Sequence, residues 1–370
     1  MNLIQNLSKN LKNFEPYTAG ASMPDISKKI GIPVDKIVKL DANENFFIEE
    51  DWIRTRIKEA VSETPMVIYP DKLGINAREA LSNYLGVEME QLLLGCGSDD
   101  LLLNLSCAFF DQESNIITTQ PSFSMYEFFA NLFGANMRSV DLKSDFQIDI
   151  DTILSQIDEK TKLIFIATPN NPTGNQFPKE EILNLIENSN TLIIVDEAYV
   201  DFANYNMIKY INDYDNLAIL RTFSKSWGLA GLRIGLCATN SELINILRGV
   251  QIPFTLNSVS QSLIPIMVKN ENYIKNKAKE VIKEREWLYN QLRAINQLIV
   301  YKSQANFILV RSNTEKMTMK ELINALMYKG VLIRDQTYVK NLDNCARITV
   351  GTRDMNFKLL ESLKEILKLS

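Results

Sequence analysis

Short apolar runs alternate with amphipathic helical stretches from about residue 50 to about residue 250 of the sequence. Apolar runs suit buried strands and the stretches between them suit crossover helices, so the pattern predicts an α/β domain with a mostly parallel sheet. We expect this large domain to contain a seven-stranded sheet. Its candidate strands are Gln91–Gly95, Asn115–Thr119, Asn136–Asp141, Lys162–Ala167, Thr191–Asp196, Leu217–Arg221 and Arg233–Ala238.

The pattern changes in the last part of the chain. Residues 272–295 form one long charged helical stretch, which is followed by shorter elements. These are strand-like Ala305–Val310, helical Met319–Lys329, strand-like Val331–Arg334 and Ala346–Val350, and a helix from Asp354. They predict a smaller α+β domain. No Gly/Ser linker precedes it, so the two domains should pack together.

Composition restricts the partners of the chain. No apolar run is long enough to span a bilayer, and the first residues lack the apolar core of a signal peptide. The net charge of -5 includes no basic block, which argues against nucleic acid or an anionic membrane as partner. Four widely spaced cysteines fit reduced thiols. We therefore expect a cytoplasmic protein that acts on small molecules.

The sequence contains no histidine. This excludes Ser-His-Asp and Cys-His nucleophile systems, histidine general bases and metal sites that need imidazole. We expect no metal site. Lysine, carboxylates, tyrosine or a cofactor must carry any chemistry.

Lys225 lies in a segment that is rich in hydroxyl groups. Thr222, Ser224 and Ser226 surround it, and Arg233 follows eight residues later. A lysine amine can form an imine with an aldehyde, while hydroxyls and a guanidinium can bind a phosphate dianion. Pyridoxal phosphate offers both groups. The segment also fits a lysine at the solvated surface, as most lysines are.

A glycine-rich turn closes the first candidate strand. In Gly95-Cys96-Gly97-Ser98-Asp99-Asp100 the glycines let backbone amides approach an anion, and the helix that follows adds positive partial charge. An ordinary turn with a serine or aspartate cap has the same pattern.

Two further motifs follow candidate strands, at the edge where open α/β sheets bind ligands. Asn170-Asn171-Pro172-Thr173-Gly174 forms a turn that presents an asparagine amide, although simple turn chemistry also accounts for it. Asp196 ends a strand, and Tyr199 follows three residues later. A carboxylate at the end of a buried strand needs a cation, and a protonated pyridine nitrogen would serve. Capping of the next helix is the alternative.

Taken in order, these motifs resemble the fold-type I pyridoxal phosphate aminotransferases over nearly the whole chain. The resemblance implies that Lys225 forms the imine with the cofactor and, once released, moves a proton between the substrate α-carbon and the cofactor C4′. It implies that Asp196 pairs with the pyridinium nitrogen, that Asn171 and Tyr199 bind the ring hydroxyl, and that Phe123 stacks on the ring. The phosphate is then held by Gly97, Ser98, Asp99, Thr222, Ser224 and Arg233.

The same resemblance implies a domain plan and an assembly. Residues 1–45 form an N-terminal arm that joins the small domain, residues 46–260 form the large cofactor-binding domain, and residues 261–370 form the small domain. The protein is expected to be a homodimer with shared active sites, in which Tyr69 and Tyr17 reach across the interface to the ligands of the partner subunit and Tyr69 binds its cofactor.

Within this superfamily the chain resembles the histidinol-phosphate aminotransferase family. The segments that carry this likeness are residues 15–20, residues 39–45, Tyr69-Pro70-Asp71, and residues 331–335 with residues 347–352. It implies transfer of an amino group from L-glutamate to a phosphorylated ketone, imidazole-acetol phosphate, in histidine biosynthesis. The implied substrate-binding residues are Tyr17, Asn43, Asn45, Arg334 and Arg347.

Three positions depart from the usual pattern of that family. Phe46-Phe47 follows Asn45 where proline is usual, Phe123 replaces the more usual tyrosine, and Asp100 stands where glutamate is common. The first change affects the substrate side, because this loop lines it.

Other functions remain possible from the sequence. Another small phosphorylated ketone, or a phospho-amino acid that is decarboxylated, would use the same cofactor residues. Either arginine could instead cover a strand edge with its stem. A binding protein on a retired aminotransferase fold would be expected to lose the imine lysine, whereas Lys225 is present.

Overall fold

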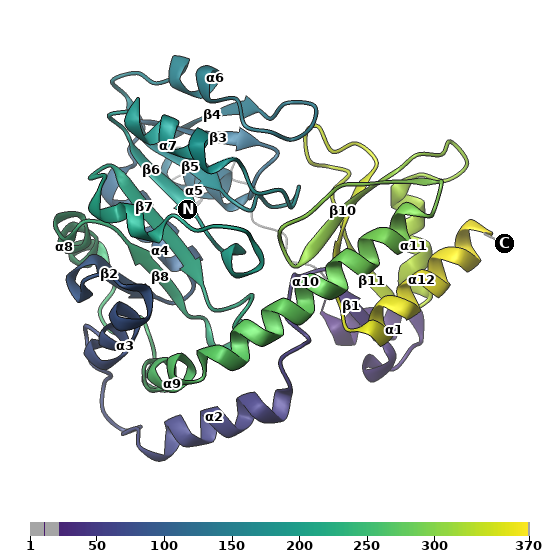
Figure 1. The fold of residues 1–370 in the computed structure, drawn as a ribbon, viewed down its shortest axis with the longest axis horizontal. Helices are drawn as coiled ribbons and strands as arrows, with labels where there is room; N and C mark the ends of the chain where they lie inside the picture. Colours follow the sequence, from purple (N-terminus) through teal and green to yellow (C-terminus); the bar gives the residue numbers. More distant parts are fainter. Residues whose placement is uncertain (1–10, 12–21, 369–370) are drawn as a thin grey trace, which may run out of the picture.

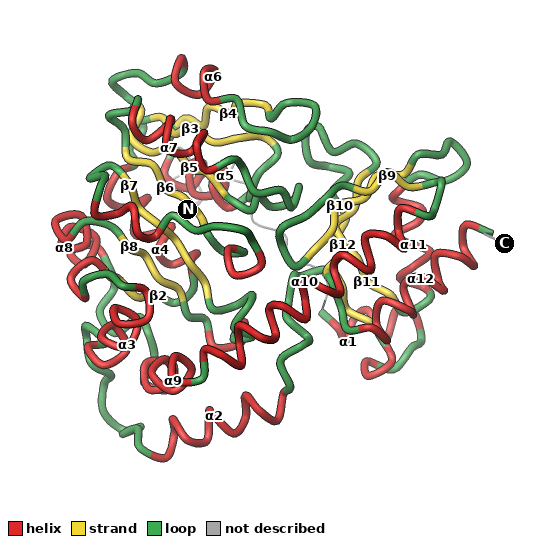
Figure 2. Tube along the Cα trace, in the orientation of Figure 1, coloured by secondary structure: helices red, strands yellow, loops and turns green. Residues whose placement is uncertain are grey.

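The computed structural model describes residue 11 and residues 22–368, which fold around two β-sheets (Figures 1 and 2). The larger sheet has seven strands in the order β2-β8-β7-β6-β5-β3-β4. Their bounds are β2 Leu92–Gly95, β3 Asn115–Gln120, β4 Asn136–Asp141, β5 Thr161–Ala167, β6 Leu192–Asp196, β7 Leu217–Thr222 and β8 Gly235–Ala238. All seven candidate strands of the large domain are confirmed.

The larger sheet is mostly parallel. Strands β4, β3, β5, β6 and β7 run parallel to one another, and β8 runs antiparallel to both β7 and β2. Strands β5 and β6 are apolar almost throughout because both of their faces are buried. Parallel strands place their carboxyl ends at one edge of the sheet, which is where the motifs of the sequence meet.

Helices cover both faces of the larger sheet. Side chains of β5 alternate between two cores, with Phe165 in one and Ile164 in the other. The first core includes residues of α4 Ser98–Phe109, α5 Met125–Phe133 and α8 Ser241–Val250. The second includes residues of α2 Glu50–Ser62, α3 Ile75–Leu85, α6 Ile150–Ser155, α7 Lys179–Glu187 and α9 Ser258–Lys269. This is the fold of a doubly covered α/β sheet.

The smaller sheet has five strands in the order β1-β11-β12-β10-β9. Their bounds are β1 Val38–Leu40, β9 Leu298–Val300, β10 Phe307–Ser312, β11 Val331–Asp335 and β12 Cys345–Thr349. Strand β1 comes from the N-terminal part of the chain and pairs in parallel with β11. The remaining helices that pack here or lie beside it are α1 Met23–Ile30, α10 Glu271–Arg293, α11 Met319–Tyr328 and α12 Arg353–Leu367.

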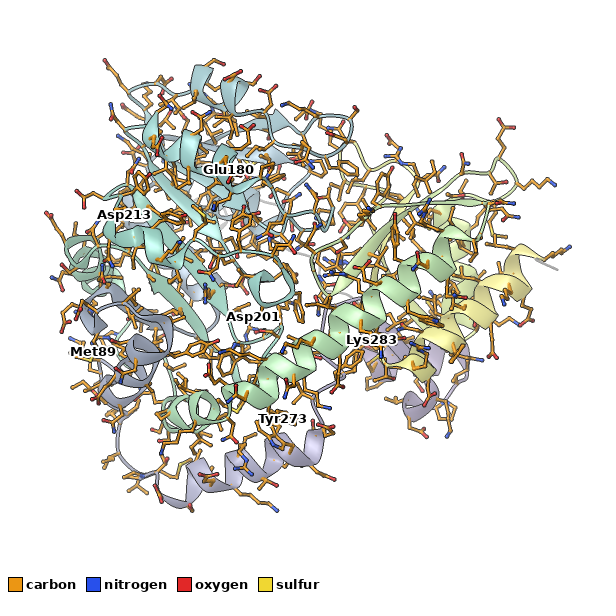
Figure 3. The ribbon with its side chains drawn as sticks, viewed as in Figure 1. Met89, Glu180, Asp201, Asp213, Tyr273 and Lys283 are labelled. Atoms are coloured by element: carbon orange, nitrogen blue, oxygen red, sulfur yellow. The ribbon has the colours of Figure 1, made fainter. Side chains whose placement is uncertain are left out.

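The long helix α10 connects the two lobes (Figure 3, where Tyr273 and Lys283 mark its course). Ile274 packs in a core of the larger sheet, whereas Ala278 and later apolar residues pack in the core of the smaller sheet. Helix α9 contacts α2 and α3, so it packs with the large lobe. We therefore propose that the division between the domains lies within α10 and not at residue 260.

Short 3₁₀ helices make up the remaining regular structure. They span Val34–Lys36, Met89–Gln91, Val200–Phe202, Ile208–Asn212 and Ala230–Leu232. Among the described residues, no helix is both long and apolar enough to cross a membrane.

Candidate active site

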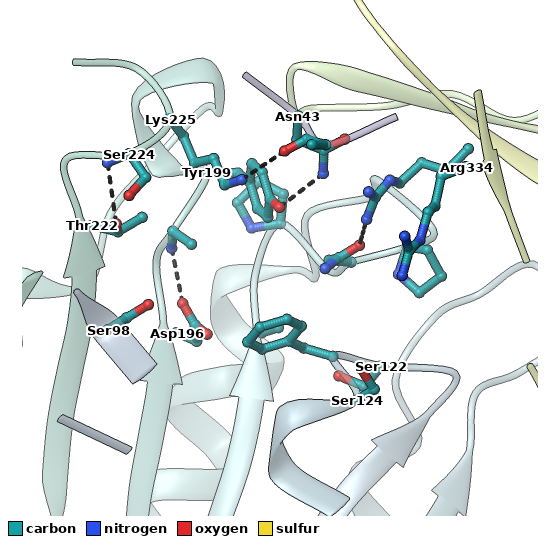
Figure 4. A pocket seen from close by; sticks show the side chains of 18 of the residues that line it. Asn43, Ser98, Ser122, Ser124, Asp196, Tyr199, Thr222, Ser224, Lys225 and Arg334 are labelled. Carbon is teal, nitrogen blue, oxygen red and sulfur yellow. Dashed lines mark hydrogen bonds between the residues drawn. The ribbon is translucent and has the colours of Figure 1, made fainter. Parts of the chain in front are cut away.

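A cavity of about 270 Å³ lies where the carboxyl ends of the large-sheet strands face the smaller sheet (Figure 4). Asp196 and Thr222 reach it from the ends of β6 and β7, and Ser98 reaches it from the start of α4. Arg334 and Arg347 reach it from β11 and β12 of the smaller sheet. The cavity is therefore at the sheet edge that the motifs predicted, and the smaller sheet forms its opposite wall.

Lys225 lies in the wall of this cavity and not at the outer surface. Its Nζ donates a hydrogen bond to the Ala42 carbonyl at 3.1 Å and lies 5.7 Å from the centre of the Tyr199 ring. Burial, together with the nearby Arg347 charge, lowers the pKa of the Lys225 amine to about 8. A part of the amine is therefore unprotonated near neutral pH, as a nucleophile requires.

Asp196 ends β6 and is only 4% exposed. Its Oδ2 accepts a hydrogen bond from the Tyr126 hydroxyl at 2.8 Å, and its Oδ1 accepts one from the Ala198 amide at 3.0 Å. Neither donor carries a positive charge, and burial raises the pKa of the Asp196 carboxyl to about 6. The next 3₁₀ helix is capped at Tyr199 and not at Asp196. A cationic ligand group at this carboxylate would offset its burial.

The side of the cavity near α4 is suited to an anion. Gly97 caps this helix with a φ of +83°, and a Cβ on Gly97 would lie 2.7 Å from Arg233 Nη2. The positive φ favours glycine here, and a side chain at this position would have to push the Arg233 guanidinium aside. Arg233 donates to Ser224 Oγ at 3.4 Å and to Asp99 Oδ2 at 3.1 Å. Backbone amides at a helix start, a guanidinium and a hydroxyl are suitable ligands for a phosphate.

The hydroxyl of Thr222 belongs to the same side of the cavity. Its Oγ1 accepts a hydrogen bond from the Ser224 amide at 3.1 Å, so it holds the turn that leads to Lys225. Both hydroxyl residues line the cavity, as Ser98 and Asp99 do.

Ring-shaped and amide side chains line the centre of the cavity. Phe123 lies in its wall, and the Tyr126 ring meets it edge-on at 5.6 Å. Asn43 donates a hydrogen bond through Nδ2 to the Tyr199 hydroxyl at 2.9 Å. Asn171 also lines the cavity, where its Oδ1 accepts a hydrogen bond from Arg347 at 2.6 Å.

Two arginines face each other across neighbouring strands at the far wall. Arg334 of β11 is the register partner of Arg347 of β12. Arg347 is 9% exposed, donates through Nη2 to the Asp41 carbonyl at 2.8 Å, and has no acceptor for its Nε. Burial lowers the pKa of Arg347, and the Arg334 charge contributes in the same direction. This wall therefore has an excess of positive charge and a free donor, which an anionic ligand would satisfy.

Of the predicted site residues that the structure describes, Gly97, Asn45 and Tyr69 do not line the cavity of their own chain, although Gly97 lies directly against Arg233, which does. Asn45 donates through Nδ2 to the Ser226 carbonyl at 2.8 Å and thus holds the segment after Lys225. Tyr69 is 78% exposed and stacks on Phe254 at 4.7 Å. Tyr17 lies outside the described residues.

The structure also shows cavity residues that sequence reasoning missed. Gln336, Tyr338 and Val339 line it from the segment that follows Arg334. The sequence signal that could have identified them is their position directly after Arg334, a predicted substrate-binding residue. Tyr126 was missed as the partner of Asp196, although it lies only three residues after Phe123 and its amide donates to the Phe123 carbonyl at 3.2 Å.

The comparisons with known proteins agree with this geometry. The family model described as aminotransferase class I and II matches residues 35–363. The chain belongs to this family. The histidinol-phosphate aminotransferase of Clostridium novyi is 36% identical over 98% of this aminotransferase and 98% of that protein.

Solved structures show the same fold. The histidinol-phosphate aminotransferase from Clostridium acetobutylicum matches with a TM-score of 0.82 and 26% identity, over 90% of this chain and 99% of that chain. The histidinol-phosphate aminotransferase from Sinorhizobium meliloti in complex with pyridoxal 5′-phosphate matches with a TM-score of 0.88 and 21% identity, over 98% and 97% of the chains. The fold is thus the fold-type I aminotransferase fold.

Class I and II aminotransferases depend on pyridoxal phosphate, and so does this enzyme. The cavity suits that group at three points of its own chemistry. Lys225 presents an amine with a lowered pKa, and Asp196 presents a buried carboxylate without a cationic partner. Gly97 leaves room for the Arg233 guanidinium at the start of α4. An aldehyde, a pyridinium and a phosphate would each find a matching partner.

Proposed function

We propose that this aminotransferase transfers the amino group of L-glutamate to imidazole-acetol phosphate, giving 2-oxoglutarate and histidinol phosphate in histidine biosynthesis. The observation that carries the proposal is the joint placement of the Lys225 amine and the Arg334–Arg347 pair in one cavity. An amine alone would suit any aminotransferase. The paired guanidiniums add selection for a substrate with a strong anion, and the related proteins named above support the imidazole compound.

Bound pyridoxal phosphate supplies an electron sink that stabilises negative charge at the substrate α-carbon. Lys225 binds the cofactor aldehyde and, when released, moves a proton between the substrate α-carbon and the cofactor C4′. Asp196 keeps the ring nitrogen protonated, because its charge lies in a low-dielectric environment where an ion pair is strong. Asn171 and Tyr199 bind the ring hydroxyl, and Phe123 stacks on the ring.

The cofactor phosphate is the proposed ligand of the anion site near α4. Amides of Gly97, Ser98 and Asp99 and the side chains of Thr222, Ser224 and Arg233 hold it. These contacts are independent of the reacting atoms, so they anchor the cofactor when Lys225 is released.

The two arginines bind the anion at the other end of the substrate. Arg347 binds the glutamate carboxylate in one half-reaction and the substrate phosphate in the other, with Arg334, Asn43 and Tyr17 assisting. A guanidinium can donate forked hydrogen bonds to either oxygen array, so one site can serve both substrates in turn. The contribution of Asn45 as a substrate ligand stays a prediction, since its amide is bonded to the Ser226 carbonyl.

We further propose a cytoplasmic homodimer in which Tyr69 binds the cofactor of the partner subunit. Four consecutive side chains of residues 66–69 are exposed and largely apolar, and Val67 is 96% exposed. Such a run is costly in water unless a second surface covers it. Tyr69 does not line the cavity of its own chain, which supports a role at the cavity of a second copy.

Turnover with alternative amino acceptors tests the proposed substrate. The enzyme would be loaded with pyridoxal phosphate, supplied with L-glutamate, and assayed for kcat/KM on imidazole-acetol phosphate and on dihydroxyacetone phosphate. We expect at least a roughly tenfold preference for the imidazole compound, the size that one added set of pocket contacts supports. Equal values, or a preference for dihydroxyacetone phosphate, would show that the imidazole is not recognised. Imidazole-acetol, which lacks the phosphate, is the matched control that tests whether the arginine pair binds the substrate phosphate.

A further inference from the structure

Tyr126 does not line the cavity, but it contacts two residues that do, Asp196 and Phe123. It lies on α5 and is 1% exposed. Its hydroxyl donates to Asp196 Oδ2 at 2.8 Å, and its ring meets Phe123 edge-on at 5.6 Å with an interplanar angle of 89°. Its other side stacks on Phe165 of β5 at 4.7 Å and 10°. The ring is therefore fixed by the core, and its two outward contacts are fixed with it.

The carboxylate of Asp196 is held by donors from two different elements. Tyr126 of α5 contacts Oδ2, and the Ala198 amide after β6 contacts Oδ1. Each carboxylate oxygen can accept about two hydrogen bonds, so each keeps one acceptor site after these contacts. With both oxygens held, the plane of the carboxylate is set before any ligand arrives.

We propose that Tyr126 is a positioning residue for the cofactor ring, which aims the Asp196 carboxylate at the ring nitrogen and supports Phe123 from behind. The inference rests on the proposed function in one respect, the placement of the ring nitrogen at Asp196. It adds a residue that touches neither cofactor nor substrate. A preset carboxylate loses less freedom on binding than a mobile one, so the contact raises cofactor affinity.

The charges around Asp196 oppose its ionisation, so the hydrogen bond from the Tyr126 hydroxyl is needed to favour the ionised form. Burial raises the pKa of Asp196, and the Asp99 and Glu197 charges act in the same direction, while the Tyr126 and Ala198 hydrogen bonds lower it. Burial also keeps the pKa of Tyr126 well above its usual value, so Tyr126 stays protonated and donates. Tyr199, the remaining titratable neighbour, has a raised pKa as well and stays neutral.

Removal of the hydroxyl would therefore raise the pKa of Asp196 further above the value of about 6. The carboxylate pairs with a pyridinium only when it is ionised, so cofactor affinity is full above this pKa and falls as the pH drops below it. In a variant with a higher pKa, the fall begins at a higher pH.

Tyr126→Phe is the direct test, because phenylalanine keeps the stacked ring and loses only the hydroxyl. Cofactor-free protein would be titrated with pyridoxal phosphate and with the carbocyclic analogue in which a C–H replaces the ring nitrogen. We expect the variant to bind pyridoxal phosphate roughly tenfold more weakly, the effect of one hydrogen bond to a charged group. The analogue should lose less than about twofold, because it cannot pair with Asp196.

Two control variants separate positioning from a general effect on folding. Tyr205→Phe removes another largely buried hydroxyl, which donates to the Phe177 carbonyl at 2.5 Å outside the cavity, and should change neither affinity. Asp196→Asn should itself reduce the preference for pyridoxal phosphate over the analogue. Adding Tyr126→Phe to Asp196→Asn should then produce no further loss of that preference.

A second substitution keeps the test valid if the phenylalanine variant folds poorly. Incorporation of 3-fluorotyrosine at position 126 retains the shape of the ring and makes the hydroxyl a stronger donor. Affinity for pyridoxal phosphate falls at low pH, and we call this fall the acid limb. We expect the acid limb to begin at a lower pH in the fluorotyrosine protein, whereas in Tyr126→Phe it begins at a higher pH. An unchanged acid limb in both proteins would overturn the proposal.

Equal weakening of both ligands by Tyr126→Phe would also overturn it, since the hydroxyl would then serve the fold alone. If Asp196→Asn leaves the preference for the ring nitrogen unchanged, the placement of that nitrogen is wrong and this inference falls with it. A different ketone substrate would leave all these affinities as predicted. The experiment thus distinguishes failure of the positioning role from failure of the proposed substrate.

Discussion

The pKa of Lys225 controls how cofactor capture depends on pH. Burial lowers this pKa from 10.5 to about 8, with Arg347 as the next contribution. At pH 7 roughly one amine in ten is then unprotonated, compared with about one in three thousand for an ordinary lysine. The structure therefore implies a gain of about three-hundredfold in the population of reactive amine.

The capture rate can be measured directly on cofactor-free enzyme. Pyridoxal phosphate would be added between about pH 6.5 and 9.5, covalent capture fixed by borohydride, and the modified protein counted by mass spectrometry. Each rate is divided by that of a simple alkylamine under the same conditions, so ionisation of the cofactor itself cancels. Lys225→Ala provides the blank.

This ratio has a distinctive shape if the burial argument holds. Below about pH 8 both amines lose protons alike and the ratio is flat, whereas above it the enzyme amine is already neutral and the ratio falls about tenfold per pH unit. Arg347→Gln removes a nearby charge, so the pKa of Lys225 rises and the bend moves to higher pH. Arg293→Gln, an exposed arginine of α10, is the matched control and should not move it. A flat ratio to pH 9.5 would refute the lowered pKa.

Three further outcomes are expected. Gly97→Ala should weaken pyridoxal phosphate binding by at least about tenfold, because the φ of +83° disfavours alanine and the new Cβ would lie 2.7 Å from the Arg233 guanidinium. Near-normal affinity in equilibrium titration would contradict the proposed phosphate site at the start of α4. In stopped-flow half-reactions, Arg347→Ala should slow both substrates, whereas Arg334→Ala should slow the phosphorylated ketone more than glutamate; equal losses in Arg334→Ala would refute that division. Heterodimers of Lys225→Ala and Tyr69→Ala chains should recover about half of wild-type activity at limiting cofactor, since one site is then whole, and no gain over Tyr69→Ala homodimers would show that Tyr69 serves its own chain.

Much of the fold can be predicted from the sequence, because buried parallel strands consist of continuous runs of apolar residues. Strand β6 is one example, since nearly every residue from Leu192 to Asp196 is buried. The strands β1 and β9 were missed for a physical reason. Each has three residues, too few for a periodicity, and β1 pairs with β11 nearly three hundred residues later. Such pairing is decided by tertiary contacts that no local pattern records.

The site was predictable where a motif has its own local geometry and not where a contact joins distant segments. Gly97 could be inferred because a turn before a helix start needs glycine. Tyr126 lies in an apolar helix and looks like a core residue, and its partner Asp196 is seventy residues away. For Asn45 the motif suggested a substrate ligand, whereas its amide is bonded to the Ser226 carbonyl.

A chain without histidine must find another proton carrier for chemistry near neutral pH. In this cavity burial shifts the pKa values of two groups toward neutral pH, one from above and one from below. The pKa of Lys225 falls to about 8 because its charged form is poorly solvated, and the pKa of Asp196 rises to about 6 for the same reason. A pyridinium at Asp196 would restore the carboxylate charge, which leaves Lys225 as the group able to give and accept a proton. One physical cause, exclusion of water from the edge of the sheet, thus prepares both the cofactor's anchor and its acid-base partner.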